Sequence, residues 1–380
     1  MSSNVDWAFA RSVAERVAGD DEFGTSYHAA SLEADLLELT TQAEGLVEAE
    51  TGLVSAAGPA RARVTDRLGW VDANLASFER LMRPLLTKME AKADEKEPKE
   101  PRGPAAEAIA EVLAPVGRAA NAVGDVVGPK FAGAQLGLLL GWMSARVLGQ
   151  YDLLITEDEN VDDQDWVYYV GPNMLSLERR YGFPPQEFRL WIAVHECTHR
   201  AQFTGVPWLR DYFLSLVNEL LDAVDPDPGR FFDLIGEQVK DLRDGNRPDL
   251  SDGGISMLFA SPEQRETMQK MAGLMSLLEG HGDIIMDRAT KDLIPSQARF
   301  ARVMSQRRKN AGGLTKLVQK LTGLEAKLAQ YEEGEEFVRA VEAEGGKELF
   351  DQVWAGPEML PNIDEIRSPE LWIARVGAPV

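Results

Sequence analysis

Residues 184–207 read PPQEFRLWIAVHECTHRAQFTGVP, and this stretch predicts the helix that decides the fold. Pro184 and Pro185 suit a helix start, and Gln186 and Glu187 lie in the first turn, where the helix dipole favours negative charge. Apolar residues anchor the middle of the run, and Gly205 and Pro207 end it. The motif inside the stretch therefore lies on a helix.

The middle of this helix carries an H-E-x-x-H motif at residues 195–199. At 3.6 residues per turn, His195 and His199 share one face, so both imidazoles can bind one zinc ion with Zn–N near 2.0–2.1 Å. Glu196 is rotated by about 100° from His195 and lies beside the ion. A carboxylate there can take a proton from metal-bound water, whose pKa zinc lowers toward about 7. The spacing predicts two zinc ligands and a general base.

A catalytic zinc site usually has three protein ligands, so the motif requires one more. The chain has only two further histidines, His28 and His281, and the better candidate is Glu279 in the segment 275–287, MSLLEGHGDIIMD. Asp283 lies four residues later on the same helical face and can accept a hydrogen bond from the second nitrogen of a ligand histidine. Asp283 is the alternative third ligand.

Three stretches resemble a family of bacterial proteins: WIAVHECTHRAQFTGVPWLRDYF (191–213), SLLEGHGDIIMD (276–287) and GLEAKLAQYEEGEEFV (323–338). The motif with its downstream Glu and Asp resembles the gluzincin type of zinc metallopeptidase. More narrowly, the stretches resemble zincin-like proteins, mostly actinobacterial, which are labelled hydrolases or zinc-dependent metalloproteases. Part of that family is associated with biosynthesis of a deazaflavin cofactor. The resemblance spans roughly residues 130–355.

This resemblance implies a mainly helical zincin-like fold with a metal site at His195, His199 and Glu279 and with Glu196 as the base. It carries over no substrate. The sequence departs from the compact gluzincins in one respect, because the separation between His199 and Glu279 is longer.

Three further residues are candidates for a place near the metal. Gln202 shares the face of His195 and His199, where its amide either hydrogen-bonds near the metal or packs the helix. His281 is either a group near the substrate or an incidental surface or core histidine. Tyr331, in KLAQY, is a candidate phenol donor to a developing oxyanion.

The whole chain predicts a mainly α protein with a small β hairpin or sheet. Residues 1–104 are expected to form an N-terminal helical region, helical to about residue 90, that ends in a charged, proline-containing linker at 91–104. Residues 105–355 are expected to form the zincin-like metal-binding domain, and residues 356–380 an irregular tail. The role of the N-terminal region stays open among a separate domain, a lid and a cover.

Two stretches rich in strand-favouring residues, Tyr151–Thr156 and Trp166–Val170, predict the hairpin. The second is either an edge strand that aligns an extended peptide or a purely structural strand. The apolar stretch 131–148 is shorter than the roughly 20 apolar residues that a membrane span needs, so it predicts a buried core helix. A basic cluster predicts a surface face or, alternatively, a clamp for an acidic substrate: Arg299, Arg302, Arg307, Arg308 and Lys309.

Composition excludes several classes of partner. The chain has 40 Lys and Arg against 62 Asp and Glu, a net charge of −22, which argues against nucleic-acid and anionic-membrane binding. Its one cysteine, Cys197, permits no intrachain disulfide and is expected to be a buried thiol on the far side of the motif helix rather than a redox group. The N-terminus has no secretory pattern, so a cytoplasmic protein is expected.

These features predict a zinc-dependent hydrolase, and first of all a metallopeptidase, that acts on a peptide or small amide substrate. Two alternatives remain: a catalytically silent binding or scaffold protein that keeps the fold and its metal, and an amide hydrolase acting on a small metabolite. The cleavage preference and the oligomeric state have no signal in the sequence.

Overall fold

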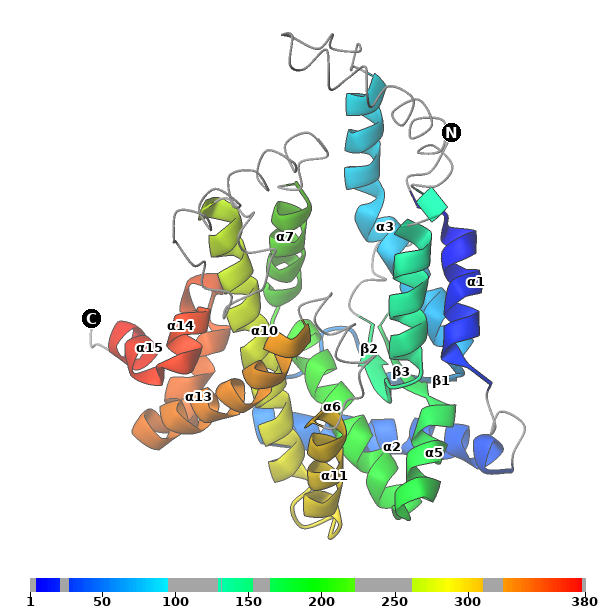
Figure 1. Ribbon diagram of the computed structural model, residues 1–380. Coiled ribbons are helices and arrows are strands. Elements are labelled where there is room, and N and C mark those ends of the chain that lie inside the picture. Colours follow the sequence, from blue (N-terminus) through cyan, green and yellow to red (C-terminus); the bar gives the residue numbers. More distant parts are fainter. Residues whose placement is uncertain are drawn as a thin grey trace, which may run out of the picture. The chain divides into compact units, whose positions relative to one another are not determined.

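A computed structural model describes residues 5–20, 27–94, 129–130, 132–152, 165–222, 262–309 and 324–377 (Figure 1). The chain forms two compact units that interleave in sequence. The first unit comprises residues 1–30, 64–148 and 169–176, and the second comprises residues 31–63, 149–168 and 177–380. The predicted domain boundary at residue 104 lies outside the described residues and stays a prediction.

The first unit is a small helical packing with α1 (Trp7–Ala18), α3 (Arg67–Asp94) and a helix over residues 132–144. Gly133, Gly137 and Gly141 recur every four residues on that last helix. A Cβ at any of them would lie 2.3–2.6 Å from a backbone oxygen of α1 or its N-cap, so the two backbones approach closely. The predicted core helix is confirmed.

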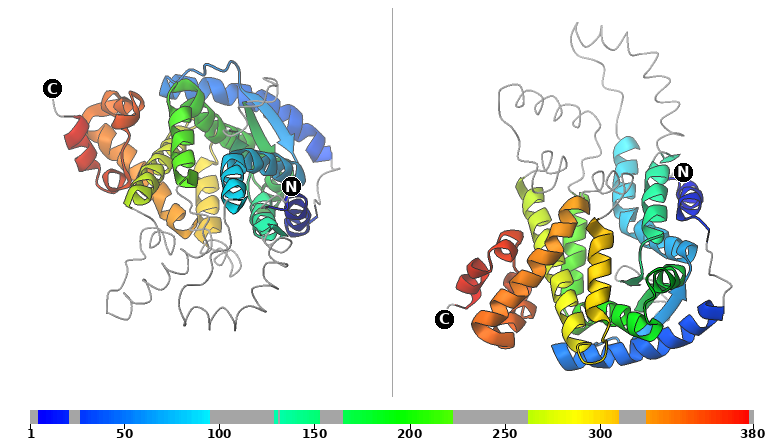
Figure 2. Two further views of the ribbon diagram at one scale, coloured as in Figure 1. Left: turned by 90° about the horizontal axis from the view of Figure 1, so that it is seen from above. Right: turned by 60° about the horizontal axis from the view of Figure 1, so that its bottom comes forward.

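The second unit contains the motif helix and most of the remaining elements. Its helices are α2 (Tyr27–Thr51, entering from the first unit), α6 (Pro185–Gly205), α7 (Leu209–Asp222), α10 (Pro262–Ala289), α11 (Gln297–Lys309) and α13 (Leu324–Phe350). α5 (Gly171–Tyr181) leads into the unit. α10 packs against both α6 and α13 (Figure 2).

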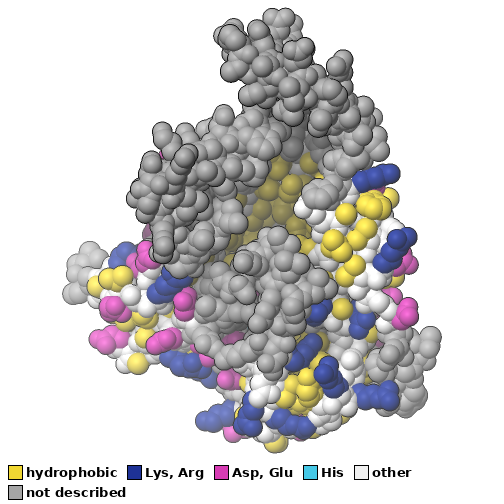
Figure 3. All heavy atoms as spheres, viewed as in Figure 1, with side chains coloured by type: hydrophobic (Ala, Val, Ile, Leu, Met, Phe, Trp, Pro, Cys, Tyr) yellow, Lys and Arg dark blue, Asp and Glu magenta, His cyan; other side chains and the backbone are white. Residues whose placement is uncertain are grey.

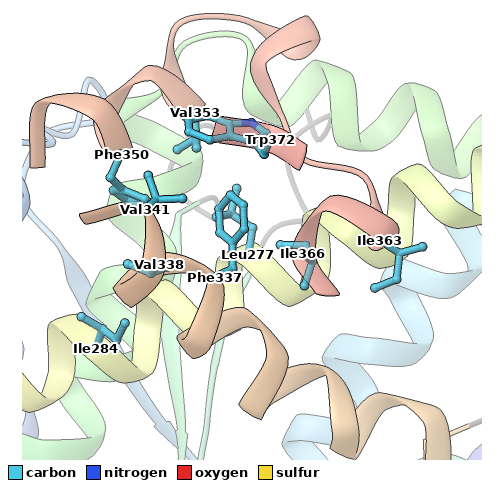
Figure 4. Packing of buried hydrophobic residues seen from close by; sticks show 10 residues of the cluster. All are labelled: Leu277, Ile284, Phe337, Val338, Val341, Phe350, Val353, Ile363, Ile366 and Trp372. Atoms are coloured by element: carbon cyan, nitrogen blue, oxygen red, sulfur yellow. The ribbon is translucent and has the colours of Figure 1, made fainter. Parts of the chain in front are cut away.

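The crossing of α10 and α13 depends on two glycines. A Cβ at Gly280 would lie 2.2 Å from the carbonyl carbon of Gly334, and a Cβ at Gly334 would lie 2.0 Å from the carbonyl oxygen of Ser276. Neither glycine breaks its helix. This close approach lets α13 cover α10, and Phe337 of α13 meets Leu277 of α10 in the buried cluster of Figure 4.

The sheet has three strands in the order β1–β3–β2: β1 (Arg61–Thr65), β3 (Trp166–Val170) and β2 (Gly149–Tyr151). The sequence predicts β3 with these bounds. The other predicted strand, Tyr151–Thr156, is represented by β2, which begins earlier and ends at Tyr151, and residues 153–164 lie outside the described part. The chain passes between the two units within β1 and β3.

β1 corrects the prediction that residues 1–90 are helical. The strand is only five residues long, and its stability comes from pairing with β3, about a hundred residues away. Arg61 and Arg63 also place their guanidinium groups over the Trp166 ring, 4.5 and 4.1 Å from its centroid. The local sequence pattern does not predict such a strand, because the residues that stabilise it are distant in sequence.

The predicted irregular tail at 356–380 is also wrong. It contains α14 (Ile363–Arg367) and α15 (Pro369–Val376), preceded by the 3-10 turns η2 (Asp351–Trp354) and η3 (Pro357–Met359). Asn362 and Glu365 form a capping box that starts α14. Trp372 is fully buried and packs edge-on against Phe337, 5.6 Å between centroids. Helices this short carry too little periodicity to be predicted without such contacts.

Two surface features complete the fold. Arg299 of the basic cluster donates to the carbonyl oxygens of Tyr181 and Gly182 and covers the Phe183 ring, so it closes the end of α5. Figure 3 shows Lys and Arg side chains gathered at the bottom of the view, where α11 lies in Figure 1. Among the described residues, no helix combines the length and apolar character needed to cross a membrane.

Candidate metal centre

Helix α6 places the two motif histidines side by side. It begins at Pro185 and ends at Gly205, within the limits that the prolines at 184–185 and the pair Gly205 and Pro207 predict. The Nε2 atoms of His195 and His199 are 3.2 Å apart, and the rings are nearly perpendicular, with an interplanar angle of 85°. The side chains keep 22% and 15% of their surface exposed, so the pair is reachable from solvent although most of the helix is buried.

Helix α10 brings Glu279 to this pair. Its Oε2 lies 3.6 Å from Nε2 of His199 and 4.0 Å from Nε2 of His195. α10 remains helical across Gly280 and Gly282. A Cβ at Gly282 would lie 3.3 Å from Cε1 of His199, so this glycine lets α10 approach the rings.

The three ligand atoms suit a tetrahedral ion. Their separations of 3.2, 3.6 and 4.0 Å are close to the roughly 3.3 Å that two ligands have when each is about 2.0–2.1 Å from a tetrahedral zinc. Two imidazoles and a carboxylate are also the donor set of many catalytic zinc sites. Within the described part of the chain, this is the one group of three such side chains gathered closely enough.

Asp283 lies at the other nitrogen of His195, with Oδ1 3.7 Å from Nδ1. It is one helical turn from Glu279, so one face of α10 presents a carboxylate to each side of the histidine pair. A carboxylate in this place can orient the ring and raise its basicity as a ligand. The arrangement fits the supporting role expected for Asp283 better than the alternative of a third ligand.

Glu196 is buried between α6 and the strand β2. A Cβ at Gly149 would lie 2.5 Å from its Cγ and 2.6 Å from its Oε1, so only glycine leaves room for the carboxylate in this position. The backbone N–H of Tyr151 donates to it. Burial raises the pKa of Glu196 to about 7, against the opposing charge of His199 and with the help of Glu279. The carboxyl group can thus exchange a proton near neutral pH.

The charges around His199 favour a cation at this point. Burial alone would lower the pKa of His199, but the adjacent Glu279 carboxylate and the charge of Glu196 outweigh it and raise the pKa to about 9. Two carboxylates and two imidazole nitrogens therefore converge where positive charge is stabilised, as a proton or as a metal ion.

The remaining predicted residues fall in different places. Gln202 is fully buried and hydrogen-bonds His199, so its amide does reach the cluster. His281 is a core histidine, 4% exposed and stacked on Phe350, and burial lowers its pKa to about 3, followed in effect by the charge of Lys347. Tyr331 belongs to α13, but its side chain lies outside the described part.

Cys197 is buried on the far side of α6, as expected, with Sγ 3.7 Å from the carbonyl oxygen of Thr40. Burial raises the pKa of its thiol, which keeps the thiol protonated and unreactive.

Of the two roles expected for residues 166–170, an edge strand and a purely structural strand, the sheet order excludes the first. β3 (Trp166–Val170) is the middle strand, and β2 (Gly149–Tyr151) is at the edge of the sheet, next to Glu196. Sequence reasoning missed Gly149, Tyr151 and Gly282 as parts of the site. No local signal marks them, because each acts through its backbone or through the lack of a side chain.

Comparisons with known proteins concern the chain as a whole. The sequence model of the zincin-like metallopeptidase family matches residues 5–373. A crystal structure described as "a putative hydrolase with a novel fold from Chloroflexus aurantiacus" is 30% identical with a TM-score of 0.67, and the match covers 99% of this chain and 100% of that one. No curated protein gives a significant match. The chain belongs to the zincin-like metallopeptidase family.

Proposed function

We propose that this protein, a member of the zincin-like metallopeptidase family, is a zinc-dependent hydrolase. Its expected substrates are amide bonds, and first of all those of peptides. One observation carries the proposal. Three potential ligand atoms of His195, His199 and Glu279 converge within 4.8 Å of one another, and the Glu196 carboxyl group, with a pKa of about 7, lies against the same helix turn.

In this proposal His195, His199 and Glu279 hold the metal ion. A zinc ion bound there supplies Lewis-acid polarisation of the substrate carbonyl and lowers the pKa of water. Asp283 orients His195 from its other nitrogen.

Glu196 performs the proton transfers. Its carboxylate takes the proton of the attacking water and later gives it to the leaving nitrogen of the amide. The backbone of Gly149 and the N–H of Tyr151 hold the carboxyl group in place, and its burial keeps the proton affinity high enough for both steps.

The edge position of β2 favours a peptide as substrate. A strand at the edge of a sheet can add an extended peptide by main-chain hydrogen bonds, and β2 lies beside the general base. The net charge of −22 favours neither nucleic acid nor anionic membrane as partner. A cytoplasmic location, an actinobacterial source and a link to deazaflavin biosynthesis stay predictions that rest on the sequence and its resemblance.

The variant Glu196→Gln tests the function. It keeps the size of the side chain but removes the base, so we expect full zinc content and a loss of hydrolysis of about 100- to 10,000-fold. Zinc is measured by elemental analysis and cleavage with a diverse peptide library alongside small amides. Glu266→Gln, at an exposed position of α10, is the matched control and should cleave like the parent.

Two outcomes would overturn the proposal. Cleavage by Glu196→Gln at the parent rate would remove Glu196 from the role of base. A parent protein with full zinc occupancy that cleaves none of the peptides or amides would instead be a scaffold that keeps the metal. Cleavage confined to small amides would assign the metabolite hydrolase.

A further inference from the structure

Gln202 makes three side-chain hydrogen bonds although it is fully buried. Its Nε2 lies 3.0 Å from the carbonyl oxygen of Leu278 and 3.0 Å from Nδ1 of His281. Its Oε1 lies 3.0 Å from Nδ1 of His199. The amide therefore links the histidine pair on α6 to the backbone and a buried ring of α10.

The carbonyl oxygen of Leu278 determines which group donates in each of these hydrogen bonds. The carbonyl oxygen of Leu278 can only accept, so the amide end that faces it must be the NH2 group. The opposite end, Oε1, can only accept, so the hydrogen between Gln202 and His199 belongs to Nδ1 of His199. In the neutral ring the lone pair of His199 then lies on Nε2 and faces His195 and Glu279, which is the form that binds a metal ion.

His281 completes the arrangement from the other side. The second hydrogen of the Gln202 NH2 group points to Nδ1 of His281, which accepts it. The ring is held in one orientation because it stacks on Phe350, 5.3 Å between centroids, and meets Trp354 edge-on at 5.3 Å. Rotation of the amide would turn Oε1 toward the Leu278 carbonyl oxygen, where two acceptors would face each other and that hydrogen bond would be lost.

We propose that Gln202 is a positioning residue for the metal site, and that His281 serves it as a fixed acceptor rather than as a group that meets substrate. Leu278 and His281 hold the amide in one orientation, and the amide holds His199 in the tautomer and ring orientation that the metal requires. This inference rests on the proposed metal site and adds to it the device that keeps one ligand ready.

The test compares zinc affinity, by competition with a chromogenic chelator, among full-length variants. Gln202→Met keeps the length of the side chain without hydrogen bonds, and we expect zinc affinity to fall about 10- to 100-fold. Gln202→Glu restores an acceptor for His199 and should regain part of that loss. Gln297→Met is the matched control, since Gln297 bonds Asp287 at the C-terminal end of α10 and none of the ligand residues, and should bind zinc like the parent.

A spectroscopic signature separates positioning from general loss of structure. In the cobalt-substituted protein, the Nδ1–H proton of each ligand histidine gives its own paramagnetically shifted signal. We expect the His199 proton to exchange slowly with solvent in the parent and rapidly in Gln202→Met, while the His195 signal is unchanged. Circular dichroism of the same samples verifies that the variants are folded.

Coupling tests the part assigned to His281. In a double-mutant cycle, His281→Phe should weaken zinc binding in the parent and add little in Gln202→Met, because its effect passes through the amide. Equal effects in both backgrounds would overturn the role given to His281. A parent that binds zinc while Gln202→Met matches it in affinity and proton exchange would overturn the inference alone, whereas a parent that binds no zinc would overturn the proposed function.

Discussion

Helix α6 carries charged groups on two faces. On one face, protein ion pairs neutralise the charges, whereas on the other face potential metal ligands converge. On the face away from the metal centre, Arg189 binds Glu178 through two parallel hydrogen bonds of 2.8 and 2.9 Å and also pairs with Asp35. Arg200 is 2% exposed and donates to Asp165, to Glu44 and to the carbonyl oxygen of Gly58. Each guanidinium is neutralised by the protein itself.

The face toward α10 is different. Its imidazole and carboxylate atoms converge on one point instead of forming ion pairs with a buried cation of the protein. The two closest ligand atoms are the Nε2 atoms of His195 and His199. In the neutral rings that bind a metal ion, each of these nitrogens offers a lone pair. Glu196 and Glu279 add two carboxylates, and the pKa of each of Glu196 and His199 is raised. The charge on this face is satisfied by a proton or a cation.

The comparison teaches how one buried helix separates stability from function. Closed ion pairs on one face anchor α6 to α2 and to the residues around β3, so the opposite face can keep ligand atoms in a fixed but chemically open arrangement. Asp165, which receives Arg200, has a φ of 61°, an unusual backbone conformation for a residue with a side chain. The ion pair helps to stabilise it.

The largest effect, on the free energy of unfolding, is expected from breaking the ion pairs on the face of α6 away from the metal centre. Arg200→Met leaves the carboxylates of Asp165 and Glu44 without their buried cation, so the free energy of unfolding should fall by about 3–5 kcal/mol. Denaturant unfolding measures it. Arg11→Met is the control, because the Arg11–Asp72 pair is exposed and should be worth less than about 1 kcal/mol. Equal losses in the two variants would show that burial of the pair is not what matters.

The second effect, on zinc affinity, concerns the face of α6 toward α10. Glu279→Ala should reduce zinc affinity by more than about 100-fold, and Asp283→Ala by about 10- to 100-fold, because a carboxylate that supports a ligand contributes less than the ligand itself. Competition with a chelator measures both. The reverse order of affinities would make Asp283 the ligand.

The third effect separates the base from the metal. Gly149→Ala would place a methyl group 2.5 Å from Cγ of Glu196, so the carboxyl group must move. We expect the rate of amide cleavage to fall up to about 100-fold while zinc affinity stays near the parent value. Gly45→Ala in α2, where a methyl group would meet nothing within 4 Å, should leave both unchanged. A loss of zinc in Gly149→Ala would mean that β2 supports the ligands and not the base.

Much of the candidate site could be predicted because its spacing is local. The limits of α6 follow from Pro185 and Gly205, and the shared face of His195 and His199 follows from the helical period. The same period places Glu279 and Asp283 on one face of α10. The roles of Gln202 and His281 could only be posed as alternatives, since the answer depends on how α10, the end of α13 and η2 pack around them.

The sequence by itself determined that a helix would present two imidazoles and an adjacent carboxyl group, because backbone hydrogen bonds within one segment set that geometry. Only the tertiary structure decided which carboxylate meets the imidazoles, which way the Gln202 amide points, and that Gly149 makes room for Glu196. It also decided that residues 61–65 form a strand and that the tail is helical. These features depend on contacts between segments far apart in the chain, and such contacts leave no period in the sequence.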